Sequence, residues 1–391
     1  MIKDDKKLNI TMISDSFYPV LGGRESAVDN LCKELNKEHN LTLATGNISP
    51  KHKTIQDFEF GYAILRSKCL KFRKYEYLCF ANKKFRKIIE NNQIDIIHTQ
   101  TKYGLCNYGI KLAKKKNIPV ITTAHTNYPE VYKKSIKCGL IRHFAIKRVV
   151  KIINKMDAVI TVSKHMAKVL EKIGCKTKIK VIPNGTDIIY PEKPQELINK
   201  VNDLYNLKNE ENVFLVVGYV SEVKNISFLL ESLSILKKKL SNFKCVFAGL
   251  GNLDYYRKKA KSLKIENNCD FIGKVSEREI LGGLFLRSDI LLFPSITDTF
   301  GLVLREAAVM KTPTLVIENQ ATSEDLVDNV NGFISPLCSK KYAEKIYNAI
   351  TNKQNLIKVG EQASKTLPKT WNEIADRTAD FYKEIIAEFK K

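Results

Sequence analysis

The stretch that decides the fold runs from Phe293 to Pro313 and reads FPSITDTFGLVLREAAVMKTP. The apolar run that leads into it, residues 290–293, predicts a buried strand. A polar loop follows, after which residues 300–310 predict a helix and residues 314–317 the next strand. A strand, a helix and a strand in this order form one unit of a parallel sheet, and open sheets of this class bind ligands at the carboxyl ends of their strands.

Two acidic residues flank that ligand position. Asp298 lies in the loop, and Glu306 follows eight residues later in the second turn of the helix. Between them, Gly301 leaves room for a ligand to approach the backbone. Free N–H groups at the start of a helix favour an anion such as phosphate. The stretch therefore predicts a phosphate site beside two carboxylates suited to hydroxyl groups. The alternative is an ordinary capped helix with acids on its surface.

The composition is typical of a soluble globular protein with two domains. The chain has 391 residues, of which 44% are hydrophobic and 27% charged, and it is too long for one doubly wound domain. No apolar run approaches the length of a membrane span, and the N-terminus does not predict a signal peptide. Nine cysteines without a CxxC pair favour reduced thiols in the cytoplasm over disulfides or a zinc site.

The chain is strongly basic, because 65 lysines and arginines stand against 42 acids and give a net charge of +23. Such a surface attracts polyanions, including nucleic acid, nucleotide substrates and anionic lipid. A general bias of the source genome toward lysine explains the charge equally well.

Two basic segments carry much of this charge. Residues 68–89 and residues 133–155 each interleave Lys and Arg with apolar side chains. We expect each to form a basic amphipathic helix that lies on an anionic membrane surface. The alternative is a domain helix with a solvated basic face. No zinc finger or RNP-like signature accompanies them, so nucleic acid is not an expected partner.

The rest of the chain alternates predicted strands and helices. Gly22 and Gly23 open a helix after the strand at residues 8–14, where a backbone can come close to a diphosphate. Their spacing is not G-x-G-x-x-G, so a nicotinamide cofactor is not supported. His125 follows the strand at residues 119–124. It could hydrogen-bond a substrate hydroxyl or phosphate there, although a lone histidine is more often structural.

The pattern Asp298-x7-Glu306 resembles the acidic E-x7-E signature of retaining GT-B glycosyltransferases of family 4. In that family the first acid contacts the donor sugar and the second contacts the ribose hydroxyls of the nucleotide. The shorter Asp at the first position is a departure that bears on sugar preference. Three further stretches match family motifs: DSFYPVLGGRE at 15–25, VIPNG at 181–185, and HTNY at 125–128, which resembles the motif of members that glycosylate lipids such as diacylglycerol.

The resemblance implies an α/β fold of the GT-B type, in which two Rossmann-like doubly wound domains face a cleft. We expect residues 1–187 to form an N-terminal domain that faces the acceptor and the membrane. Residues 188–370 are expected to form a C-terminal domain that binds the nucleotide sugar. Residues 371–391 are expected to form a helix that packs back on the N-terminal domain.

The resemblance also implies the residues of the site. Lys224 matches the family lysine that neutralises the donor diphosphate. Tyr219 stands where the family has an arginine, and one hydroxyl does not replace a guanidinium fork, so we hypothesise that Arg24 supplies the missing charge. The expected catalytic residues are His125, Lys224, Asp298 and Glu306. The expected substrate contacts are Gly22, Gly23, Arg24, Tyr128, Tyr219, Gly249, Gly251, Ile272, Thr299, Phe300, Gly301, Leu302 and Val303.

The activity implied by the resemblance is that of a retaining hexosyltransferase that needs no metal and no cofactor, since the nucleotide sugar is a co-substrate. The favoured reaction moves glucose from UDP-glucose to a membrane lipid acceptor such as 1,2-diacylglycerol. The protein would then be cytoplasmic and peripheral on the inner face of the cell membrane. One alternative is a glycosyltransferase that makes a capsular or other surface glycan. The other is a GT-B protein that binds a sugar nucleotide without turnover, which remains an alternative because Tyr219 replaces the family arginine.

Overall fold

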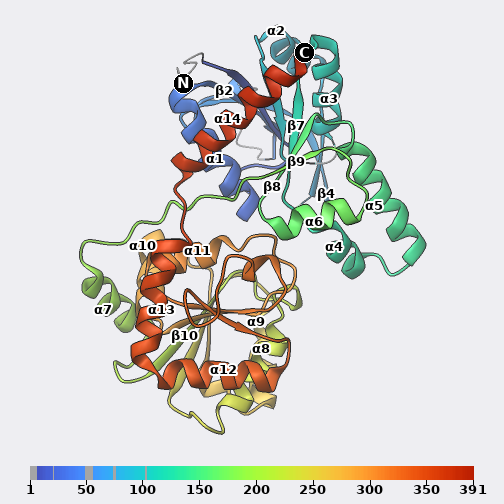
Figure 1. The fold of residues 1–391 in the computed structure, drawn as a ribbon. Helices are drawn as coiled ribbons and strands as arrows, with labels where there is room; N and C mark the ends of the chain where they lie inside the picture. The colour runs from blue at the N-terminus through green and yellow to red at the C-terminus, as the bar shows by residue number, and fades with distance from the viewer. Residues whose placement is uncertain (1–6, 21, 49–55, 74–75, 102–103) are drawn as a thin grey trace. The chain divides into compact units, whose positions relative to one another are not determined.

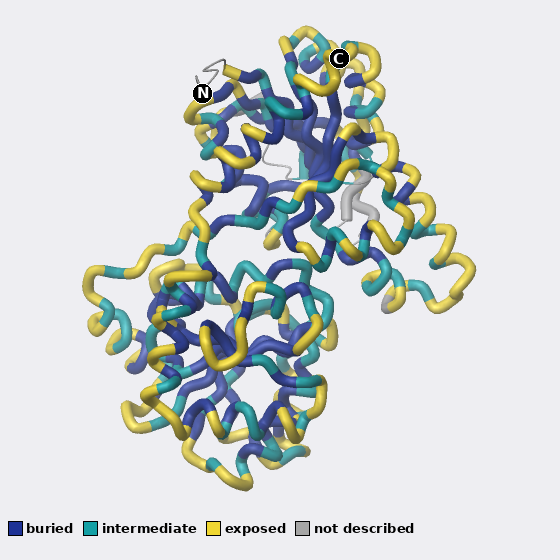
Figure 2. Tube along the Cα trace, in the orientation of Figure 1, coloured by how far each residue is buried: buried dark blue, intermediate teal, exposed yellow. Residues whose placement is uncertain are grey.

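A computed structural model describes residues 7–20, 22–48, 56–73, 76–101 and 104–391. The chain divides into two compact units. The N-terminal unit comprises residues 1–185 and 370–391, and the C-terminal unit comprises residues 186–369. In each unit, helices cover a mostly parallel sheet (Figure 1), and the buried residues concentrate on the strands (Figure 2).

The sheet of the N-terminal unit runs in the order β3-β4-β2-β1-β6-β7-β8-β9, with β5 paired to β4. Among the described strands, only β3–β4 and β4–β5 pair antiparallel. Strands β6, β7 and β8 are buried along their whole length, as expected where helices cover both faces of a sheet. The strands are β1 (Asn9–Ser14), β2 (Asn40–Gly46), β3 (Gln56–Asp57), β4 (Ala63–Arg73), β5 (Glu76–Phe80), β6 (Ile96–Thr99), β7 (Val120–Ala124), β8 (Ala158–Thr161) and β9 (Lys178–Val181).

The helices of the N-terminal unit include the last helix of the chain. That helix, α14, begins with a capping box between Thr370 and Glu373, packs against α1, and buries Trp371 and Tyr382. The helices are α1 (Gly23–Glu38), α2 (Lys83–Asn91), α3 (Leu105–Lys116), α4 (Tyr128–Ser135), α5 (Gly139–Ile153), α6 (Lys164–Lys172) and α14 (Trp371–Phe389).

The prediction of one basic helix over residues 68–89 is wrong. Residues 68–73 end β4, residues 76–80 form β5, and only α2 at Lys83–Asn91 is helical; residues 74–75 lie outside the described part. The first half of β4 pairs with β2, from Ala63 beside Thr42 to Ser67 beside Gly46. This long-range pairing fixes β4 as a strand and carries it into the hairpin with β5. The second basic segment is helical over α5, which follows α4 after a short break.

The C-terminal unit has a parallel sheet in the order β12-β11-β10-β13-β14-β15. Its strands are β10 (Asn212–Val217), β11 (Phe243–Ala248), β12 (Cys269–Gly273), β13 (Ile290–Phe293), β14 (Thr314–Ile317) and β15 (Phe333–Ser335). Its α-helices are α7 (Pro194–Tyr205), α8 (Ile226–Leu236), α9 (Leu253–Ser262), α10 (Arg278–Arg287), α11 (Leu302–Val309), α12 (Ser339–Thr351) and α13 (Lys353–Thr366).

Both sheets have a point where the strand order reverses. In the C-terminal unit β10 lies between β11 and β13, and in the N-terminal unit β1 lies between β2 and β6. Loops that leave the carboxyl ends of such strands diverge to opposite faces and leave a crevice for a ligand. The two sheets confirm the predicted doubly wound α/β fold, and their reversal points locate the loops that can bind ligands.

Candidate active site

The reversal point of the C-terminal unit brings Lys224 and Asp298 together. Lys224 ends a short 3-10 helix, Glu222–Lys224, that follows β10, and Asp298 lies in the loop that follows β13. The Lys224 Nζ atom donates to both carboxylate oxygens of Asp298, at 2.6 and 2.8 Å. About a quarter of each side chain is exposed, 25% and 22% respectively, so a ligand can reach the pair.

Two further bonds hold these loops in register. The Asn225 amide donates to the Pro294 carbonyl at 3.2 Å, and the Thr297 hydroxyl donates to the Val223 carbonyl at 3.1 Å. Asn225 adopts a left-handed conformation with φ of 59°, which asparagine tolerates well. The positions of Lys224 and Asp298 therefore follow from backbone contacts as well as from their own ion pair.

The start of α11 is fixed by a buried arginine. Gly301 has φ of 75°, a value that favours glycine, and it precedes the first helical residues, Leu302 and Val303. The guanidinium of Arg305 lies 4.1 Å from the centre of the Phe300 ring and donates to the Phe300 carbonyl at 2.8 Å. Because the Phe300 ring is buried, a ligand can use only the backbone at this residue.

Glu306 is held by a residue that the sequence pattern does not indicate. Arg278, the first residue of α10, donates to Glu306 at 3.0 Å and also bonds Asp187. Burial raises the pKa of Glu306, and the nearby Arg278 opposes that shift. Nothing in the spacing of Arg278 or Asp187 predicts this contact, since they lie 28 and 119 residues before Glu306.

Close packing of the backbone explains why positions 249 and 251 are glycines. A Cβ atom at Gly249 would lie 1.7 Å from the Gly218 carbonyl oxygen, and one at Gly251 would lie 2.1 Å from the Val220 carbonyl oxygen. The loops after β10 and β11 thus pack backbone against backbone, as the hydrogen bond from the Val220 N–H to the Leu250 carbonyl also shows. Close packing of the loops accounts for both glycines without a ligand.

Of the remaining expected contacts of the C-terminal unit, Tyr219 lines a small cavity with Lys224, whereas Ile272 lies in the edge strand β12. Tyr219 is 45% exposed at the carboxyl end of β10. Thr299 and Ile272 are half-buried, the first just before Phe300 and the second in β12.

In the N-terminal unit, the Arg24 side chain forms hydrogen bonds with a residue of its own helix and with a residue of the loop after β1. Its guanidinium donates to the Glu25 carboxylate at 2.7 Å and to the Ser16 hydroxyl at 2.6 Å. Ser16 in turn donates to buried Glu25. Gly22 caps α1, and a Cβ atom there would lie 2.6 Å from a Glu25 oxygen, so this glycine makes room for the cluster; Gly23 is the first helical residue.

His125 follows β7 and lies beside the loop after β6. Its Nε2 atom is 2.6 Å from the amide oxygen of Gln100. Burial and the nearby charge of Arg24 lower the pKa of His125 to about 3, so the ring is neutral. Tyr128 begins α4 and is buried in an apolar cluster with Val149 and Leu170, away from solvent.

The expected catalytic residues therefore fall into separate groups. Lys224 and Asp298 are in contact, Glu306 pairs with Arg278, and His125 belongs to the other unit. Within the described ranges, no three His, Cys, Asp or Glu side chains gather in a way that could hold a metal ion. Also within those ranges, no helix has the length and apolar character needed to cross a membrane.

Two family matches and the fold decide the identity of the chain. Residues 21–189 match Glycosyltransferase Family 4, and residues 193–366 match Glycosyl transferases group 1. Sucrose-phosphate synthase from Thermosynechococcus elongatus shares the fold with a TM-score of 0.79 at 17% identity, over 98% of this chain and 100% of that one. The chain is a GT-B glycosyltransferase. Anabaena HepE in complex with UDP-glucose shares the fold with a TM-score of 0.78 at 18% identity, over 96% of this chain and 100% of that one.

Two relatives of this glycosyltransferase are named as synthases of a glucosyl-diacylglycerol. The alpha-monoglucosyldiacylglycerol synthase of Streptococcus pneumoniae is 27% identical over 334 residues, which cover 83% of this chain and 74% of that protein. The enzyme of the same name from Acholeplasma laidlawii is 25% identical over 342 residues, which cover 83% of this chain and 84% of that protein.

Proposed function

We propose that this glycosyltransferase moves glucose from UDP-glucose to a membrane lipid such as 1,2-diacylglycerol, with retention at the anomeric carbon. The observation that carries the proposal is the Lys224–Asp298 pair at the reversal point of the C-terminal sheet, followed by Glu306 on the next helix. A cation, a carboxylate and a helix N-terminus are the groups that a diphosphate and its sugar require.

Each group has one part of the donor to bind. Lys224 would neutralise the diphosphate together with the N–H groups at the start of α11, which makes the nucleoside diphosphate a better leaving group. Asp298 would accept hydrogen bonds from sugar hydroxyls, and Glu306 from the ribose. The acceptor hydroxyl would attack the face from which the diphosphate departs. The anomeric C–O bond to phosphate breaks, the new C–O bond forms on the same side, and the leaving phosphate oxygen takes the hydroxyl proton.

A lipid acceptor is supported by the surface of α5 and by the names of the two relatives. Leu140, Ile141 and Phe144 are 66%, 59% and 61% exposed, and their spacing places them on neighbouring positions of the helix surface. Arg142, Lys147 and Arg148 lie on the same helix. Exposed apolar side chains beside basic ones are typical of helices that lie on an anionic membrane. The protein would then work as a peripheral protein on the inner face of the cell membrane.

The test is release of nucleoside diphosphate from a panel of UDP-, GDP- and ADP-sugars, with and without anionic vesicles that contain diacylglycerol. We expect release from UDP-glucose that depends on the vesicles. Release that depends instead on a soluble glycan acceptor would replace the lipid with a surface glycan. Donor binding without release under every acceptor condition would show a protein that binds sugar nucleotides without turnover.

Arg24 is proposed to supply the positive charge that Tyr219 lacks. We expect Arg24→Ala to lower the rate of transfer at least about tenfold more than Tyr219→Phe does, because only the arginine can neutralise a phosphate. The rates are compared at saturating donor. Equal rates for Arg24→Ala and the unaltered protein would remove Arg24 from the mechanism.

A further inference from the structure

Two cysteines of the N-terminal unit face each other across the hairpin of β4 and β5. Cys69 and Cys79 are direct partners in the antiparallel register of these strands, and both thiols are free. Side chains of directly opposite residues lie on the same face, with Cβ atoms about 4.5–5.5 Å apart. A disulfide needs Cβ atoms about 3.5–4.5 Å apart. A small approach of the two strands is therefore enough to join the sulfur atoms.

Gly46, the last residue of β2, leaves the space in which the two thiols lie. A Cβ atom at this position would be 2.5 Å from the Cys79 Sγ atom, 2.8 Å from the Asp15 carbonyl oxygen and 3.3 Å from the Cys69 Cβ atom. Both cysteines and the loop after β1 thus converge on one point that has no side chain. A larger residue at position 46 would displace the Cys79 sulfur.

Each thiol donates a hydrogen bond to the backbone of a neighbouring loop. The Cys79 Sγ atom donates to the Asp15 carbonyl at 3.0 Å, and the Cys69 Sγ atom donates to the Asn47 carbonyl at 2.8 Å. A disulfide sulfur has no hydrogen to donate, so oxidation of the pair removes both bonds. The loop after β1 then loses a contact that holds it to the hairpin.

The two thiols differ in exposure, which sets the order in which they react. Cys79 is only 2% exposed, whereas Cys69 is half-buried and within reach of a small reagent. Burial raises the pKa of both thiols, so both are protonated at neutral pH and react faster as the pH rises. We therefore expect Cys69 to react first and Cys79 to resolve the product.

We propose that Cys69 and Cys79 form a reversible disulfide by exchange with a low-molecular-weight disulfide, and that this bond loosens the loop after β1. The Cys69 thiolate attacks one sulfur of the small disulfide, which forms a mixed disulfide and releases one thiolate. The Cys79 thiolate then attacks the Cys69 sulfur, which forms the internal disulfide and releases the second thiolate. The protein loses two electrons and two protons, and the small disulfide gains them and becomes two thiols.

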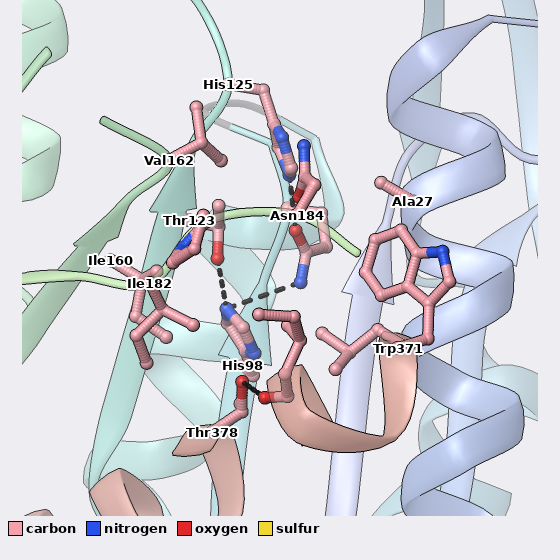
Figure 3. Close-up of a pocket in the computed structure, with 14 residues that line it drawn as sticks. Ala27, His98, Thr123, His125, Ile160, Val162, Ile182, Asn184, Trp371 and Thr378 are labelled. Carbon is pink, nitrogen blue, oxygen red and sulfur yellow. Dashed lines mark hydrogen bonds between the residues drawn. The ribbon is translucent and has the colours of Figure 1, made fainter. Parts of the chain in front are cut away.

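The loop after β1 leads into α1, which borders a small cavity of the same unit. Figure 3 shows Ala27 of α1 together with His98 and His125 around this cavity. A change in the loop can therefore reach the surroundings of His125, one of the expected catalytic residues. An effect of oxidation on transfer rests on the proposed function, whereas the disulfide does not.

The test is incubation of the full chain with glutathione disulfide at pH 8, followed by alkylation of free thiols, digestion and mass spectrometry. We expect two peptides joined through Cys69 and Cys79, two hydrogen atoms lighter than the separate peptides, which dithiothreitol separates again. Cys79→Ser should stop at a glutathione adduct of Cys69. Cys69→Ser should leave Cys79 unmodified, because that thiol is buried.

Cys245 and Cys269 are the matched control, because they are also register partners, on the parallel strands β11 and β12. They are 0% and 7% exposed, so glutathione disulfide should not link them. In the oxidised protein, the amides of residues 15–18 should exchange hydrogen faster than in the reduced protein. Transfer from UDP-glucose should fall about fivefold on oxidation, as expected for one lost hydrogen bond. It should recover on reduction, and Cys79→Ser should show no such response.

Absence of the link between Cys69 and Cys79 overturns the proposal, whether or not Cys69 carries glutathione. Equal linkage of the control pair also overturns it, because the hairpin geometry would then have no specific effect. A link that leaves hydrogen exchange at residues 15–18 unaltered contradicts the loosening of the loop. If the link forms, exchange becomes faster and no donor supports transfer, the disulfide stands and the proposed function fails.

Discussion

At the scale of single residues, the two acids of the signature are balanced by different cations. Asp298 faces Lys224, which also lies 5.2 Å from the centre of the Phe293 ring, and Glu306 faces Arg278. In the proposed reaction, a bound donor would share Lys224 with Asp298.

Lys224→Met should lower the rate of transfer about a hundredfold, because the charge that stabilises the leaving diphosphate is lost. The free energy of unfolding should change by less than about 1 kcal/mol, since the Lys224–Asp298 pair is partly exposed. Lys244→Met is the matched control, because Lys244 pairs with Asp270 at 3.4 Å in the same unit. Equal losses of transfer in both variants would contradict a specific role for Lys224.

Asp15 gives the stability of the protein a recognisable pH dependence. Its carboxylate accepts from the N–H of Leu105, the first residue of α3, at 2.8 Å, yet burial raises its pKa from 3.8 to about 6. The folded state therefore holds this proton more tightly than the unfolded state. The resulting stability is complete below about pH 4 and is lost as the pH rises through about 6, which amounts to about 3 kcal/mol.

Asp15→Asn should remove that loss, because an amide stays neutral and its oxygen can still accept from Leu105. Denaturant unfolding at pH 4 and pH 7 measures the difference, with Asp254→Asn at an exposed position as the control. Identical pH dependence in Asp15→Asn and the unaltered protein would show that folding does not change the pKa of Asp15.

The positions of the two acids can be predicted from the sequence, but their partners cannot. The spacing of Asp298 and Glu306 places both acids near one helix start, because a strand, loop and helix follow each other without interruption. The partners of the site come from more distant segments: Lys224 and Asp298 are 74 residues apart. No local pattern marks such pairs, since they meet only after two elements pack.

At the scale of elements, the loops after β10 and β11 form one tightly packed surface. Gly249→Ala should destabilise the C-terminal unit by about 3 kcal/mol, because the new Cβ would lie 1.7 Å from a carbonyl oxygen and the loops must separate. The measurement is a urea unfolding curve. Gly273→Ala is the control, with φ of 76° and open space around its Cβ, and should cost about 1 kcal/mol. Equal losses of stability in Gly249→Ala and Gly273→Ala would mean that backbone conformation, and not close packing, requires glycine at position 249.

The exposed face of α5 leads to a second prediction at this scale, which concerns binding to membranes. Combined Leu140→Ser, Ile141→Ser and Phe144→Ser should weaken binding to anionic vesicles more than tenfold, because each side chain contributes when it leaves water. The melting temperature should not change, since all three are exposed. Val327→Ser, Val330→Ser and Leu337→Ser, which are exposed in the C-terminal unit, form the control set. Sedimentation with vesicles measures both sets, and equal loss would remove α5 as the membrane surface.

The hairpin of β4 and β5 shows why local patterns mislead at the element scale. Interleaved basic and apolar residues fit a helix period and a strand period over a short stretch. Pairing of β4 with β2 decides between them, and that partner lies more than twenty residues earlier in the chain. The buried strand β13 is predictable because Ile290–Phe293 is a continuous run of four apolar residues, which can be recognised without knowing its partner strand.

At the scale of the whole molecule, each unit has its own mostly or entirely parallel sheet, its own core and its own reversal point. The alternation of strands and helices predicts two such units from sequence, because parallel strands need helical crossovers. Lys224 and Asp298 lie in the C-terminal unit, whereas His125 and the exposed face of α5 lie in the N-terminal unit. The proposed reaction assigns the sugar nucleotide to the first and the lipid to the second.

The most direct test of this account is analysis of the lipid product. UDP-glucose labelled in the sugar is incubated with the protein and vesicles of anionic lipid and diacylglycerol, the lipids are extracted, and proton NMR gives the configuration at the anomeric carbon. The account predicts a glucosyl-diacylglycerol with the α configuration of the donor. A β-linked product, or labelled glucose released only to water, would contradict it.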